Sequence, residues 1–227
     1  MPEAKQLDDN AISLSIPGSG RWFRNHAAFA AWAESSKSCA LWVHSPPGYG
    51  KTNLASRIAE LGNGMLPEDT IVATFFCKGD YRTADEGGGG NVLRHCLSQA
   101  AWSEREKKFN DCVIAEYDTY CKDGPGTGRN VWPGQRLHPE ECRAMLVTIS
   151  KERPIVFVLD GLDDYGLRTR EAVMRNLRYV STHCCQPVKV ILFSSKEQNI
   201  VSLERISPIH HTRLAKCGPT AEIGRGI

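Results

Sequence analysis

Residues 42–54 read WVHSPPGYGKTNL, a match to three of the four fixed positions of the phosphate-binding pattern G-x-x-x-x-G-K-[ST]. Gly50, Lys51 and Thr52 match, and Ser45 stands where the pattern has its first glycine. That first position mainly starts the turn, and serine can occupy the non-helical backbone angles there. We therefore expect Ser45 to weaken phosphate binding at most. The alternative is a turn between a strand and a helix that binds no ligand.

The residues on either side place this loop between a strand and a helix. Before it, residues 40–43 form a short apolar run, which is typical of a strand covered on both faces. After it, Leu54, Ile58 and Leu61 recur at helical spacing, and Gly62 is expected to end the helix. A phosphate loop needs this order of strand, turn and helix, so the context favours a functional loop.

Each loop residue has a physical task in nucleotide binding. Gly48 and Gly50 can take positive φ angles and turn backbone amides toward phosphate oxygens at the helix N-terminus. Lys51 would reach the β- and γ-phosphates, and Thr52 would offer its hydroxyl to Mg²⁺. The candidate nucleotide-binding residues are Ser45, Gly48, Tyr49, Gly50, Lys51, Thr52 and Asn53.

A second strand signal ends in carboxylates. Residues 155–159 read IVFVL, as expected for a central parallel strand, and Asp160 follows directly. Nucleotides bind at the carboxyl ends of such strands, so Asp160 and Thr52 are the candidate Mg²⁺ ligands. Asp163 and Asp164 come next, and either can orient and deprotonate an attacking water. The alternative for these two residues is an acidic surface turn.

A third strand signal, over residues 188–193, is followed by Ser194, Ser195 and Lys196. These residues fall at the carboxyl end of the strand, close to where a γ-phosphate would lie. Lys196 joins the two aspartates as a candidate catalytic residue that senses this phosphate. A solvated lysine is the other interpretation, with similar weight.

The remaining signals complete an alternation of strands and helices. Trp22, Phe29 and Trp32 are spaced to lie on a helix that packs on the domain. The glycine run before Asn91 is interpreted as a connection ahead of the next helix. Residues 118–138 are predicted to be a solvent loop, because their glycine-rich stretch has no strand before it and no Lys-Ser/Thr ending. Further strands are expected over 71–77 and near 210–214, with helices over 138–150 and 170–180.

This alternation predicts an α/β fold, namely the three-layer fold of P-loop NTPases. We expect a parallel sheet of about five strands with helices on both faces. A chain of 227 residues is long enough for one such domain.

Composition limits the class of partner. With 41% hydrophobic and 24% charged residues the chain is ordinary for a globular protein, and its net charge of +2 provides no reason to expect nucleic acid or an acidic membrane. No apolar stretch approaches the ~20 residues that span a bilayer, and the first residues lack a secretory signal. The nine cysteines include no Cys-x-x-Cys pair. We expect a cytoplasmic protein with free thiols.

The motifs WVHSPPGYGKT, IVFVLDGLDD and ILFSSK, in this order, resemble those of the NACHT family of STAND-class P-loop NTPases. The resemblance is to the nephrocystin-3-like N-terminal type found in large fungal NLR-like proteins. GSGRWFRNHAAFAAW, at residues 18–32, is similar to the entry segment of that group, and the likeness covers residues 18–215.

The resemblance implies a signalling switch that binds ATP or GTP with Mg²⁺, hydrolyses it slowly and assembles with other copies. It places Lys51 and Thr52 at the Walker A pair and Asp160 at the Walker B carboxylate. Lys196 stands where the family has a sensor arginine. Ser45 in place of glycine, Asp164 in place of glutamate and Lys196 in place of arginine suggest weakened hydrolysis more than lost binding.

The domain organisation predicted is a loose arm over 1–17, the nucleotide-binding domain over 18–215 and a tail over 216–227, without the family's helical and winged-helix subdomains. The leading hypothesis is a nucleotide-gated protein-interaction switch that works through a protein partner or its own copies. One alternative is a turnover-competent small P-loop NTPase or kinase. Another is a degenerate fragment that binds no nucleotide and serves as an interaction module.

Overall fold

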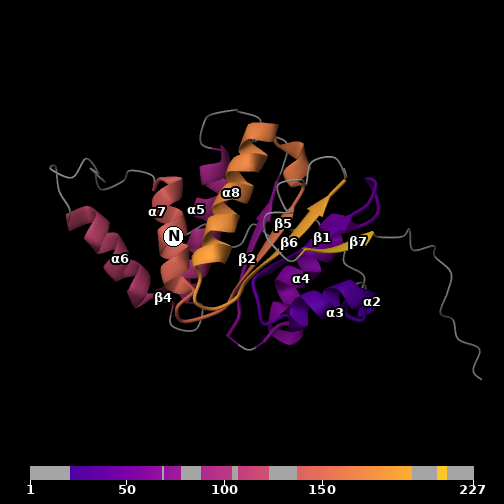
Figure 1. Ribbon diagram of the computed structural model, residues 1–227, viewed down its shortest axis with the longest axis horizontal. Helices are drawn as coiled ribbons and strands as arrows, with labels where there is room; N and C mark the ends of the chain where they lie inside the picture. Colours follow the sequence, from indigo (N-terminus) through magenta and orange to yellow (C-terminus); the bar gives the residue numbers. More distant parts are fainter. Residues whose placement is uncertain are drawn as a thin grey trace, which may run out of the picture.

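The computed structural model describes residues 21–67, 69–77, 88–103, 107–122, 137–195 and 209–213. Within them, a five-stranded parallel sheet lies between two layers of helices (Figure 1). The strand order is β2-β5-β6-β1-β7. The strands are β1 (Cys39–His44), β2 (Ile71–Phe76), β5 (Ile155–Asp160), β6 (Val188–Ser194) and β7 (Ile209–Arg213). The predicted fold class, sheet and layers are confirmed.

Helices cover both faces of the sheet, as the continuous apolar strands require. One face packs against α5 (Gly88–Ala101), α7 (Pro139–Ile149) and α8 (Leu167–His183). The other packs against α3 (Ala27–Glu34) and α4 (Lys51–Met65). Alternate residues of the four strands β1, β2, β5 and β6 enter one core or the other: on β6, Val190 and Leu192 lie in the first and Ile191 and Phe193 in the second.

The sheet order determines where the functional loops meet. Strand β6 pairs with β1 on one side and with β5 on the other, all in parallel. The loop that follows β1 and the carboxylate that ends β5 therefore flank the carboxyl end of the same central strand. This arrangement joins residues that are more than a hundred positions apart in the sequence.

Three local predictions were wrong. Trp22, in the short helix α2 (Arg21–Arg24), has 45% of its surface exposed, and its neighbour Phe23 is buried instead. Helix α4 continues past Gly62 to Met65. The glycine run belongs to α5, which begins at Gly88 rather than near Asn91; a Cβ on Gly89 would lie 2.9 Å from Ala172 Cβ, so this glycine allows α5 to approach α8 closely.

Two features had no counterpart in the sequence analysis. A two-stranded antiparallel hairpin joins β3 (Trp102–Ser103) to β4 (Lys108–Phe109). It leads into α6 (Asp111–Lys122), which packs outside α7 (Figure 1). A further prediction was wrong at its start: helix α6 continues to Lys122, whereas a loop was predicted from residue 118. Residues 123–136 lie outside the described part of the chain.

The other predicted elements agree with the structure to within a few residues. Helix α7 begins after His138, whose backbone N–H donates to Glu141 Oε2 at 2.7 Å, and Pro139 occupies its first turn. No helix in the described segments has both the length and the hydropathy needed to cross a bilayer. The predicted arm at 1–17, the tail at 216–227 and Lys196 lie outside the described residues.

Candidate functional site

The loop between β1 and α4 has two glycines in the left-handed backbone conformation. Gly48 and Gly50 have φ angles of 81° and 79°, which L side chains rarely adopt. A Cβ at either position would meet no atom within 4 Å, so conformation rather than space explains these glycines. No backbone acceptor in the described segments takes the N–H groups of Gly48, Tyr49 or Gly50. These donors and the N-terminus of α4 are suited to an anion.

Ser45 serves the loop without needing the backbone freedom of glycine. The described non-glycine residues with positive φ are Asp69 and Lys107, so Ser45 adopts ordinary angles. It is buried, and its N–H donates to the Ser194 carbonyl of β6 at 3.3 Å. The Ser45 backbone therefore ties the start of the loop to the end of the central strand.

Lys51 lies across the mouth of the loop. Its Nζ donates to the carbonyl oxygens of Ser45 at 2.7 Å and Pro46 at 3.1 Å. Burial lowers the pKa of Lys51, and the negative charges of Asp160, Asp163 and Asp164 oppose this shift. The ammonium group is thus held by neutral carbonyls that phosphate oxygens can replace.

Thr52 and Asp160 are in direct contact. The Thr52 hydroxyl, in the first turn of α4, donates to Asp160 Oδ2 at 2.6 Å, across 108 positions of sequence. Asp160 ends β5 and is buried. Burial raises its pKa to about 6; the Thr52 bond and the Lys51 charge lower it, and the charges of Asp163 and Asp164 raise it further.

The two following carboxylates have different surroundings. Gly161 has φ of 75°, and the short 3-10 helix η2 (Leu162–Asp164) begins after it. Asp163 Oδ2 accepts a hydrogen bond from the backbone N–H of Ser195 at 2.8 Å, which ties η2 to the end of β6. Asp164 is exposed. Asp163 therefore orders the turn that follows β6, whereas Asp164 faces solvent.

The structure brings together Ser45, Lys51, Thr52, Asp160 and Asp163. Two other candidates are peripheral: Tyr49 is half-buried in the loop, and Asn53 is exposed on the first turn of α4.

Sequence analysis missed two residues that support the site. The Trp42 indole N–H donates to Ser194 Oγ at 2.9 Å, and the Cys77 N–H donates to the Asp160 carbonyl at 2.8 Å. Both bonds join different strands, so no local signal marks them. Ser194 was noted only as a residue ahead of Lys196.

The donors at this edge fit Mg²⁺ held together with a nucleotide. Across the described segments no group of three or more His, Cys, Asp or Glu side chains is arranged to hold a metal by itself. A hydroxyl and one carboxylate, with phosphate oxygens and water completing the shell, are what P-loop proteins provide. The contact between Thr52 and Asp160 places these two ligand types together.

The parallel sheet, the glycine loop opening a helix and the carboxylate at the end of β5 define the class of P-loop NTPase-like domains. Within that class the chain belongs to the family described as nephrocystin 3, N-terminal, whose model matches residues 18–195. The resemblance inferred from the motifs is confirmed.

Two solved structures show low similarity to the chain. One is titled as Drosophila ORC bound to DNA, with 10% identity and a TM-score of 0.44, covering 91% of this chain and 97% of that one. The other is the Aeropyrum pernix ORC1 protein in complex with DNA, with 13% identity and a TM-score of 0.43. The match covers 86% of this chain and 44% of that one. At these values neither bears on the function of this chain, and the absence of a nucleic-acid partner stays a prediction. No curated protein matches the sequence.

Proposed function

We propose that this chain is the Mg²⁺-dependent ATP- or GTP-binding domain of a signalling switch, with weak hydrolysis and an output through protein contacts. The observation that carries the proposal is the 2.6 Å contact between Thr52 and Asp160 beside Lys51. A hydroxyl at a helix start and a buried carboxylate at a strand end have no local reason to pair. Their pairing at the mouth of a glycine loop is the arrangement that shares a magnesium ion.

In this proposal the loop binds the phosphates and the strand ends position the metal. The N–H groups of Gly48 to Gly50 and the N-terminus of α4 hold phosphate oxygens. Lys51 exchanges its carbonyl partners for the β- and γ-phosphates, a stronger charge-assisted bond. Thr52 and Asp160 hold Mg²⁺, which when bound neutralises charge on the phosphates.

The surroundings of Asp163 and Asp164, the two carboxylates that are not assigned to the metal, favour weak hydrolysis. The carboxylate of Asp163 is occupied by the Ser195 amide, which makes it a positioning residue for the turn before Lys196. Asp164 is then the candidate general base, and as an exposed side chain it is poorly held for orienting a water. Lys196 is the candidate sensor of the γ-phosphate.

An apolar groove supports an output through protein contacts. It has a volume of about 490 Å³ and lies between α5, α6 and α7. Phe109 and Ile114, on its edge, have 40% and 44% of their surfaces exposed. Apolar side chains exposed together are typical of interaction surfaces. The same groove favours the second candidate function, an interaction module that binds no nucleotide.

Calorimetric titration of the purified chain with ATP and ADP, with and without Mg²⁺, tests the proposal. Lys51→Ala should abolish binding, because it removes the cation that meets the phosphates. Lys37→Ala removes an exposed lysine ahead of β1 and should leave the affinity unchanged. Asp160→Ala should mainly remove the dependence on Mg²⁺.

Unchanged affinity in Lys51→Ala would exclude the assigned phosphate site. No binding at all by the folded chain would favour the interaction module. Sustained turnover that a small molecule accelerates would instead favour a small P-loop NTPase or kinase.

A further inference from the structure

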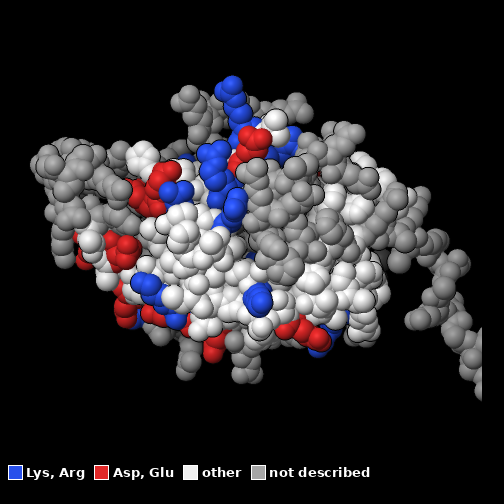
Figure 2. Space-filling model, viewed as in Figure 1, with Lys and Arg blue, Asp and Glu red and all other residues white. Residues whose placement is uncertain are grey.

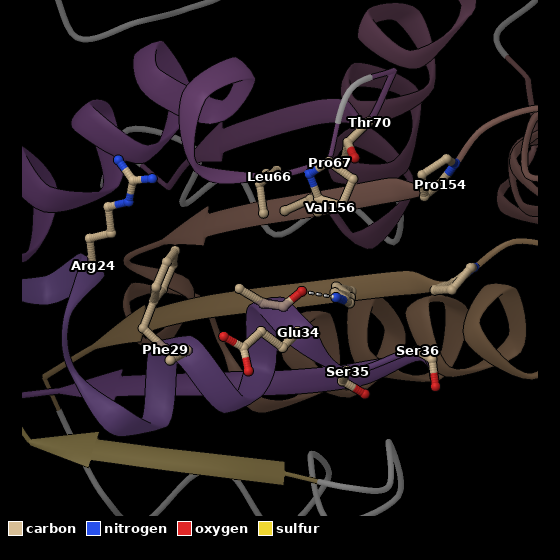
Figure 3. Close-up of a pocket in the computed structure, with 14 residues that line it drawn as sticks. Arg24, Phe29, Glu34, Ser35, Ser36, Leu66, Pro67, Thr70, Pro154 and Val156 are labelled. Carbon is tan, nitrogen blue, oxygen red and sulfur yellow. Dashed lines mark hydrogen bonds between the residues drawn. The ribbon is translucent and has the colours of Figure 1, made fainter.

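A pocket of about 560 Å³ lies at the amino ends of the central strands (Figure 3). Its walls include Pro154 and Pro187, which precede β5 and β6, and Thr70, which precedes β2. The phosphate loop lies at the carboxyl ends. Lys189, on the pocket floor, is five residues before Ser194 on β6, or roughly 16 Å at the usual rise per residue. The pocket is therefore separate from the proposed nucleotide site.

Lys189 is a buried cation on an otherwise apolar face of the sheet. Its neighbours across the strands are Cys39 and Val156, and it is only 7% exposed. Ion pairs in the described segments join Arg57 to Glu60 and Lys108 to Asp111, and none includes Lys189. Lysine is rarely buried without a charged partner, because desolvation of its ammonium group is costly.

The hydrogen bonds of Lys189 leave donors for a ligand. Its Nζ donates to the Ala33 carbonyl at 2.6 Å, in the last turn of α3, and lies 5.6 Å from the Trp32 ring centroid. An ammonium group has three N–H donors, so capping α3 accounts for one of them. Thr70 also lines the pocket, but its hydroxyl oxygen is fully buried and does not reach the pocket surface. The group that the pocket offers to a ligand is therefore the Lys189 ammonium.

The rest of the pocket is suited to an apolar body. Its sides include Phe29 from α3, Leu66 from the segment ahead of β2 and Val156 from β5 (Figure 3). The volume lies within the range of small-molecule sites. Among the charged residues of the lining, Arg24 and Lys189 outnumber Glu34.

We propose that this pocket binds a small organic acid. Lys189 holds the anionic group, and Phe29, Leu66 and Val156 contact the apolar body. An anion restores the charge balance that the buried ammonium lacks. A neutral molecule of the same shape does not.

The experiment uses the fluorescence of anilinonaphthalene sulfonate, an aromatic anion, with the whole chain, followed by displacement with octanoate and with octanol. We expect octanoate to displace the probe saturably and octanol at equal concentration to displace far less. Lys189→Met, which keeps the apolar stem and removes the charge, should weaken octanoate binding at least tenfold.

Replacing Lys189 also removes its bond to the Ala33 carbonyl, so two further variants test the pocket while Lys189 stays in place. Ala30→Phe adds an aromatic ring to the pocket lining on α3 and leaves residue 189 unchanged, and it should also abolish displacement by octanoate. Ile114→Ser changes the apolar groove instead and should leave displacement unchanged. The proposal fails if octanol displaces as well as octanoate, if Ala30→Phe retains binding, or if only Ile114→Ser loses it. If Lys189→Met does not fold, Ala30→Phe decides.

Discussion

Ser45 is buried at the start of the phosphate loop, and its main-chain groups bond to Ser194 and Lys51. These bonds use the Ser45 backbone, and its φ angle is not positive. A glycine at this position would therefore add neither a hydrogen bond nor a backbone angle that the loop needs. The departure from the sequence pattern is thus compatible with the loop geometry.

Ser45→Gly should leave nucleotide affinity within about threefold and lower the free energy of unfolding by about 1 kcal/mol, since glycine gains more freedom in the unfolded chain. Calorimetry and urea unfolding measure the two quantities. Ser36→Gly, at an exposed position, is the matched control. Affinity that rises tenfold in Ser45→Gly would mean that the serine impairs the site.

The carboxyl group of Asp160 has a raised pKa, about 6 against an ordinary 3.8. The folded chain therefore holds this proton more tightly than the unfolded chain does. The stability that this group contributes is fully present below about pH 4 and is lost as the pH rises through about 6. At neutral pH the buried negative charge of Asp160 destabilises the chain, and the proposed Mg²⁺ would offset this cost.

Asp160→Asn keeps the shape and removes the charge. In EDTA at pH 7.5 it should raise the free energy of unfolding by about 1–3 kcal/mol, and at pH 4.5 by much less. Urea unfolding at the two pH values measures this difference. Asp118→Asn, an exposed carboxylate on α6, should have little effect at either pH. An equal gain at both pH values in Asp160→Asn would argue against the raised pKa.

The turn between β5 and η2 depends on one backbone conformation. Gly161 has positive φ, and a Cβ there would lie 3.0 Å from the Cys77 carbonyl oxygen and 3.4 Å from Asp164 Oδ2. The same turn carries Asp163 to the Ser195 amide. Strain here would move the acidic residues relative to β6.

Gly161→Ala should therefore cost about 1–3 kcal/mol of unfolding free energy, through left-handed strain and the close carbonyl. Thermal unfolding measures the loss. Gly166→Ala, at the N-cap of α8, is the control, because its φ is −62° and no atom lies within 4 Å of the added Cβ. Similar losses in both variants would contradict the assigned role of the turn.

The arrangement of whole layers leaves two contrasting surfaces. The groove between α5, α6 and α7 exposes Phe109 and Ile114, whereas basic side chains gather over α8 (Figure 2). Exposed apolar side chains clustered in one groove favour association more than a single one does.

Replacing both Phe109 and Ile114 by serine should raise the concentration at which the chain begins to self-associate by severalfold, as measured by sedimentation velocity. Leu167→Ser is the control, because Leu167 is 56% exposed and lies outside the groove. If the control acts as strongly as the double variant, the groove is not the associating surface.

The phosphate loop, the central strands and Asp160 could all be predicted from the amino-acid sequence. Their signals extend over a few neighbouring residues: apolar runs of strand length, glycines where φ is positive, and Lys-Thr at a helix start. In these segments the backbone preferences of the residues and the burial of their side chains favour the same local structure. Pattern alone was therefore sufficient for the fold class and for naming Thr52 and Asp160, which the structure brings into contact.

Other features depended on contacts between distant segments. Gly89 lies within a helix because Ala172 packs against it, and Asp163 differs from Asp164 because the Ser195 amide lies beside it. The run that contains Lys189 reads as an ordinary strand, and its buried ammonium group becomes unusual only when α3 covers that face. Local conformation is a property of neighbours in sequence, whereas burial and pairing of charge are properties of neighbours in space.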